Sequence, residues 1–167
     1  IERMEISMPA EGMTVAALKN LIYMLYSKQY LLNRATGSYV LSISDGVVAR
    51  LKEYTPETPE AFSELLADFI ALDELDGIDF RDGAVTMAFP HDAEHPENWT
   101  AYGFLLDRIV KAAQAADRVF SKKQRPENEK YYMRSWLIRL WLGGLEFKAL
   151  RNLMLRNLKG NTAFPDE

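Results

Sequence analysis

The fold class is decided by residues 58–89, which read TPEAFSELLADFIALDELDGIDFRDGAVTMAF. In the first half, Thr58 has the form of a helix cap and Pro59 stands at the first helical position, with apolar residues at helical spacing behind them. In the second half, two short apolar runs flank Asp82-Gly83, a dipeptide that supplies the positive φ angles of a tight hairpin. Together these features predict an α+β fold.

Outside this stretch the sequence predicts mainly helices, with capping residues such as Thr14 and closing glycines such as Gly37. Apolar periodicity and these caps predict helices over residues 14–37, 44–51, 99–122, 131–142 and 145–159. Short strands are expected at residues 4–8 and 39–42, a polar loop at 91–98 and a linker at 124–129. The expected architecture is a mainly helical α+β fold, with a small antiparallel sheet of two to four short strands and a C-terminal helical hairpin around Gly143-Gly144.

The composition excludes several classes of protein. The chain has 167 residues, of which 48% are hydrophobic and 26% charged, so it is long enough to bury one core. It has no cysteine, which excludes thiol catalysis, thiolate zinc sites and iron–sulfur clusters. No apolar run approaches the roughly twenty residues of a membrane helix, and no signal peptide is visible. We therefore expect a cytoplasmic protein without a membrane partner.

The net charge of −4 conceals a strong asymmetry along the chain. Residues 1–121 hold ten Lys or Arg against nineteen Asp or Glu, whereas residues 122–160 hold ten against three. This division predicts an acidic α+β lobe over residues 1–121 and a basic helical hairpin over residues 122–167, packed together as one compact domain. A basic segment indicates a polyanionic partner, but it is more typical of a segment whose charge is neutralised by the acidic lobe.

The basic hairpin contains the residues that we expect to contact nucleic acid. On a helical wheel they form one face of the last helix, where Lys and Arg side chains meet phosphates well. Three more cations at the start of this segment are expected to assist. Leu155 in the middle of the face favours the alternative of a packed or solvated surface. The predicted contact residues are Lys148, Arg151, Asn152, Arg156 and Lys159, with Lys122, Lys123 and Arg125.

Two other sequence patterns are more typical of structural roles than of a binding or catalytic site. Trp136 and Trp141 have the ring systems of a base-stacking platform, but a helix that is apolar nearly all round is more typical of a core. The segment from His91 to His95 matches the H-x-x-E-H zinc pattern through Glu94, yet prolines on both sides disfavour the helix that this site needs. We predict a loop there, and expect no catalytic residue, metal or cofactor.

The two ends of the chain carry several recognisable stretches: residues 4–27 and the motifs N-E-K-Y at 128–131, R-x-W-L-x-R-L at 134–140 and G-N-x-A-F at 160–164. In these stretches the chain resembles an uncharacterised family of bacterial proteins from phages and other mobile elements, some labelled virulence-related. Trp141 and Phe147 depart from the family pattern, where a smaller residue and a tyrosine are usual. The resemblance implies a mobile-element setting and supplies no catalytic residue.

The leading hypothesis is therefore a non-enzymatic binding protein of a phage or mobile element that contacts nucleic acid through its basic C-terminal helices. The alternative is a protein-interaction or assembly module that forms a homodimer through its apolar stripes and binds no nucleic acid. Salt-dependent DNA binding supports the first hypothesis, and a concentration-dependent dimer supports the second.

Overall fold

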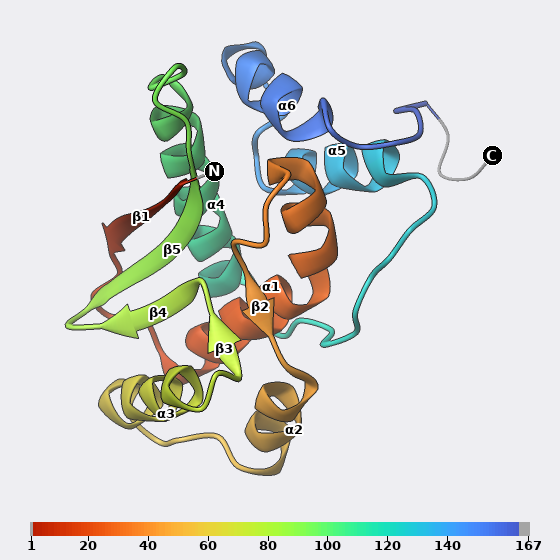
Figure 1. The fold of residues 1–167 in the computed structure, drawn as a ribbon. Coiled ribbons are helices and arrows are strands. Elements are labelled where there is room, and N and C mark those ends of the chain that lie inside the picture. Colours follow the sequence, from red (N-terminus) through yellow and green to blue (C-terminus); the bar gives the residue numbers. More distant parts are fainter. Residues whose placement is uncertain (1, 164–167) are drawn as a thin grey trace.

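The computed structural model describes residues 2–163, so Phe164, the last residue of the G-N-x-A-F motif, and residues 165–167 lie outside the described part. The fold class is the predicted one, with helices dominating over a small antiparallel sheet (Figure 1). In chain order the elements are β1 (Glu2–Pro9), α1 (Val15–Thr36), β2 (Ser42–Ile43), α2 (Asp45–Glu53), α3 (Pro59–Ala71), β3 (Leu75–Asp76), β4 (Ile78–Arg81), β5 (Ala84–His91), α4 (Asn98–Ala115), α5 (Glu129–Arg139), the 3-10 turn η1 (Leu145–Phe147) and α6 (Lys148–Leu155).

The main sheet contains three antiparallel strands in the order β1-β5-β4. Arg81 pairs with Ala84, so the predicted Asp82-Gly83 turn joins β4 to β5. The φ angles of these two residues are 53° and 72°, the positive values that a two-residue type I′ turn requires. α3 packs against β4, whereas α4 contacts β1 and β5. The predicted hairpin is confirmed.

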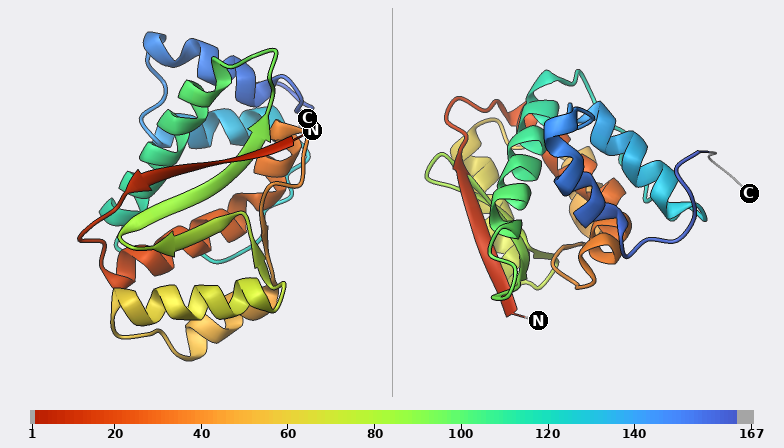
Figure 2. Two further views of the ribbon diagram at one scale, coloured as in Figure 1. Left: turned by 60° about the vertical axis from the view of Figure 1, so that its left-hand side comes forward. Right: turned by 90° about the horizontal axis from the view of Figure 1, so that it is seen from above.

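α1 is the central helix of the core. The Thr14 hydroxyl caps it by accepting a hydrogen bond from the Ala17 N–H at 3.1 Å, and Gly37 ends it with a left-handed φ of 70°. α2, α3, α4 and α6 all contact α1, which buries it from Leu21 to Lys28. Seen from above, β1, α4, α6 and α5 follow one another across the molecule (Figure 2). No helix within residues 2–163 has both the length and the apolar character that crossing a membrane requires.

The strand predicted at residues 39–42 is displaced toward the C-terminus. Only Ser42 and Ile43 pair, and their partners are Asp76 and Leu75. The preceding residues are held by a side chain instead, because the Asn33 amide oxygen accepts hydrogen bonds from the N–H groups of Val40 and Leu41 at 3.1 Å each. Hydrogen bonds to a side chain of α1 therefore replace the strand pairing that the local sequence predicted for these residues.

The helix predicted over residues 99–122 ends at Ala115, so its last seven residues were wrongly assigned. The buried side chain of Asn20 explains this end, because its Nδ2 donates to the carbonyls of Ala113 and Ala116 at 3.1 and 3.0 Å. Residues 116–128 then cross the molecule without regular structure, and we call them the strap. Phe120, which was expected on the buried stripe, is 86% exposed.

The C-terminal hairpin is present, but its second helix is shorter than predicted. Residues 145–147 form the 3-10 turn η1, and the α-helix itself spans only Lys148–Leu155. α6 contacts α5, α4 and α1, so the hairpin packs on the rest of the molecule. α5 was expected to be buried all round, yet Ile138 on its outer face is 43% exposed. Burial is confined to one side of α5, as it is on most amphipathic helices.

Candidate functional site

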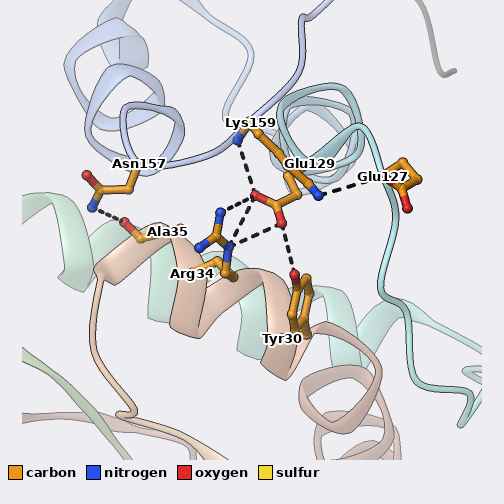
Figure 3. A network of polar contacts seen from close by, with 7 residues as sticks. All are labelled: Tyr30, Arg34, Ala35, Glu127, Glu129, Asn157 and Lys159. Carbon is orange, nitrogen blue, oxygen red and sulfur yellow. Dashed lines mark hydrogen bonds and ion pairs between the residues drawn. The ribbon is translucent and has the colours of Figure 1, made fainter. Parts of the chain in front are cut away.

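A buried carboxylate attaches the basic hairpin to α1 (Figure 3). The Glu129 side chain is fully buried and accepts hydrogen bonds from Arg34 Nη2 at 3.1 Å, from the Tyr30 hydroxyl at 3.1 Å and from the Lys159 N–H at 3.1 Å. Burial acts to raise the pKa of Glu129, but hydrogen bonds from Arg34, Lys159 and Tyr30 outweigh it and lower the pKa below its ordinary value. Glu129 therefore remains ionised and holds the start of α5 against α1.

The end of the hairpin closes back onto its beginning. The Asn128 Oδ1 accepts hydrogen bonds from the Tyr131 N–H at 3.2 Å, which caps α5, and from the Asn161 N–H at 3.0 Å. The Lys130 N–H also donates to the Lys159 carbonyl at 2.9 Å. Residues 128–131 and the described part of the second motif, residues 160–163, thus meet here, and the contacts between them hold the hairpin together.

Arg151, one of the predicted contact residues, serves the turn of the hairpin. Its Nη1 donates to the carbonyls of Leu142 and Gly144 at 2.8 and 2.7 Å. These carbonyls follow α5 and lack helical partners, so the guanidinium satisfies them. Arg151 is half-buried in this position and fixes the path from α5 to α6.

The outer surface of the hairpin carries an unneutralised basic face. Lys148, Asn152 and Arg156 are exposed four residues apart along α6. Lys130 of α5 lies across a shallow groove from Asn152 and Arg156, and Arg134 follows Lys130 by one helical turn. Within residues 2–163 none of these four cations forms an ion pair. We call the set the outer face; it comprises Lys130, Arg134, Lys148, Asn152 and Arg156.

Acidic groups border the outer face on more than one side. Asp92 and Glu94, in the loop after β5, line a hollow together with Arg156. Glu129 is enclosed by its own partners, and Glu127 lies 3.7 Å from Lys159 Nζ, which it partly neutralises. Glu146 is exposed at the turn before α6. Lys159 thus differs from the other predicted contact residues of α6, because its backbone supports Glu129 and its ammonium has an acidic neighbour.

The three assisting cations lie on the strap, in a different part of the molecule from the outer face. Lys123 pairs with Asp45 at 2.8 Å, and Arg125 lies 4.6 Å over the ring of Tyr30. The hydrogen bond from Lys123 is the largest influence that lowers the pKa of Asp45. Lys122 is exposed beside them. The eight predicted contact residues therefore form two groups, one within residues 148–159 and one on the strap. In the second group, Lys123 and Arg125 line a hollow along α1.

A buried lysine lies where the strap crosses α1. Lys28 hydrogen-bonds to Gln124, and its ammonium lies 5.7 Å from the ring centre of Trp136. Burial, and then the charge of Arg139, lower the pKa of Lys28 to about 8. Trp136 is 3% exposed, which confirms it as a core residue. The same prediction for Trp141 is wrong, because that residue follows the end of α5 and is 52% exposed.

The H-x-x-E-H pattern lies where a loop was predicted. His91 is the last residue of β5, and His95 lies in the following turn with its Nδ1 3.1 Å from Glu97. The two histidines therefore share no helix. Within residues 2–163, no group of three or more His, Cys, Asp or Glu side chains is arranged to hold a metal ion.

Comparison with known proteins finds no match. This holds for protein-family models, for curated proteins and for solved structures. The outer face must therefore be interpreted from its own geometry. Sequence reasoning identified Lys148, Asn152 and Arg156 but missed Lys130 and Arg134, although their spacing of four residues on α5 is the same signal.

Proposed function

We propose that the chain is a binding protein that contacts nucleic acid through the outer face. The observation that carries the proposal is that four cations of two packed helices are engaged in no ion pair within residues 2–163. Arg134, Lys148 and Arg156 are exposed, and Lys130 is half-buried. Cations that form no ion pair within the described residues are available to phosphates, and binding would release the counterions condensed on the nucleic acid.

The arrangement of the outer face on two helices favours binding to an extended polyanion. Residues four apart on a helix are separated by about 6 Å along its axis, so α6 presents a row of polar groups instead of one pocket. Arg134 and Arg156 can bind phosphate oxygens bidentately, and Asn152 adds hydrogen-bonding capacity between Lys148 and Arg156. The contacts of Glu129 and Arg151 hold this row in place. The resemblance to mobile-element proteins supplies a setting for the proposal but no residue.

The test is a charge reversal on the outer face. We expect wild-type protein to bind a labelled 20-nucleotide oligo(dT) with an affinity that falls steeply with salt in fluorescence anisotropy. In the double variant Lys148→Glu/Arg156→Glu, affinity should fall. The slope of log K against log salt should become shallower by about 1.4, because each single-strand phosphate that is no longer neutralised reduces the slope by about 0.7. Arg151 is left unchanged because its substitution would disturb the turn.

The control carries one charge reversal of the same kind, half the total change of the double variant, at another place. Lys52 is exposed on α2, at the opposite end of the molecule from α6 (Figure 1). Lys52→Glu should leave both affinity and salt slope nearly unchanged. If the double variant and the control behave alike, the outer face is not the binding surface. A chain that binds no nucleic acid but forms a dimer in light scattering would favour the assembly module instead.

A further inference from the structure

Trp141 has a backbone conformation that its side chain disfavours. Its φ angle is 61°, in the left-handed region. The other two non-glycine residues with positive φ within residues 2–163 are Asp73 and Asp82, and aspartate tolerates this region through local hydrogen bonds. A tryptophan gains no such compensation, so the fold holds Trp141 in a conformation that glycine would adopt more easily.

The hydrogen bonds around Trp141 explain why the backbone has this shape. The Trp141 N–H donates to the Ile138 carbonyl at 3.0 Å, and the Leu142 N–H donates to the Leu137 carbonyl at 2.9 Å. This is a Schellman motif in which Trp141 occupies the position usually taken by glycine. Leu137 and Leu142, whose side chains are fully buried, anchor the motif. The backbone and these leucines therefore make the turn, and the indole is not required for it.

The Trp141 indole is exposed next to a row of cationic and apolar side chains. It is 52% exposed, beside exposed Ile138 on the last turn of α5. Spacing places Lys130, Arg134 and Ile138 along one side of α5, and Trp141 follows two residues after the helix ends, so two cations precede an aromatic ring along this part of the hairpin. A neutral apolar partner would have to desolvate the cations, whereas a single-stranded nucleic acid offers phosphates to them and a base to the ring.

We infer that Trp141 stacks on an unpaired base of a single-stranded nucleic acid whose phosphates lie on the outer face. This inference rests on the proposed function and specifies its substrate class. In a duplex both faces of each internal base are covered by neighbouring pairs, so a ring presented in this way selects single strands. The strained turn is then the device that presents the indole outward.

Three variants test the inference. Trp141→Gly removes the ring and fits the left-handed backbone, so the thermal unfolding temperature should not fall. Its affinity for oligo(dT) should decrease about five- to hundredfold, which corresponds to the removal of one stacked base. Trp141→Phe should retain most of the affinity. Trp99→Ala removes an equally exposed tryptophan on α4 and should change nothing.

Heparin, a polyanion without bases, separates this inference from the proposed function. Trp141→Gly should bind heparin like wild type and keep the wild-type salt slope on oligo(dT). An unchanged affinity for oligo(dT), an equal decrease on heparin, or conversion of a dimer into a monomer in light scattering would each overturn the stacking role. Failure of the proposed function looks different, because the Lys148→Glu/Arg156→Glu variant would then leave the salt slope intact.

Discussion

Glu129 is the residue on which the attachment of the hairpin to α1 depends most. Substitution by glutamine keeps the shape but replaces an ionised acceptor of several hydrogen bonds. We expect Glu129→Gln to lower the free energy of unfolding at pH 7 by about 2–4 kcal/mol, less than for a wholly enclosed pair because Arg34 is 44% exposed. Urea unfolding followed by circular dichroism measures this decrease.

The same substitution has a defined pH dependence. Because the folded state lowers the pKa of Glu129 below 4.5, its contribution is fully present above pH 4.5 and disappears as the pH falls through the folded-state pKa. The difference between wild type and Glu129→Gln should therefore shrink in acid. Glu127→Gln, an exposed neighbour, should have no measurable effect at either pH. Equal stability of Glu129→Gln and wild type at pH 7 would contradict the role assigned to the carboxylate.

Residue roles of this kind were largely invisible in the sequence. Glu129 is one of three acids in the basic segment, and its partner Arg34 lies 95 residues away. Arg151 was assigned to a binding face because a helical wheel shows direction and spacing but not which carbonyls lack partners. Lys148, Asn152 and Arg156 could be identified because exposure along a short amphipathic helix follows from spacing alone.

At the scale of elements, local signals predicted how helices begin. Thr14 and Thr58 cap α1 and α3 through hydrogen bonds to N–H groups three residues ahead, and the Asp82-Gly83 turn involves only its own residues. The predicted end of α4 was wrong because Asn20, which lies in α1, donates hydrogen bonds to the carbonyls at the end of α4. Prediction failed where a distant side chain decides an element's boundary.

Gly160 tests how the hairpin closes after α6. Its φ is 104°, and a Cβ there would lie 2.0 Å from Asn128 Oδ1, the oxygen that joins the two ends of the hairpin. Gly160→Ala should lower the free energy of unfolding by about 3 kcal/mol or more, because both backbone strain and a clash are introduced. Thermal or urea unfolding provides the measurement.

Gly12 provides the matched control for that substitution. Its φ is 80°, but no atom outside its chain neighbours lies within 4 Å of the position of a Cβ. Gly12→Ala should therefore show the conformational effect alone, about 1–2 kcal/mol. If the two variants are destabilised equally, the contact between Gly160 and Asn128 contributes nothing to the closure.

At the scale of the whole molecule, the charge asymmetry of the sequence is only partly neutralised in the fold. Glu129 of the basic segment pairs with Arg34 of the acidic one, and Lys123 of the strap pairs with Asp45. Arg134, Lys148 and Arg156 of the outer face remain exposed to solvent. Neutralisation within the chain thus applies to one group of residues, and a polyanionic partner stays a prediction for the other. The sequence could not divide the two groups because the division depends on tertiary packing.

The most direct measurement is a map of the oligo(dT) contact surface by NMR on ¹⁵N-labelled protein. We expect the largest shift changes at the amides of the outer face and at the indole N–H of Trp141. Amides of residues 122–125 on the strap and of the β1-β5-β4 sheet should remain in place. Changes concentrated on the strap, or spread over the sheet with none on the hairpin, would contradict the account.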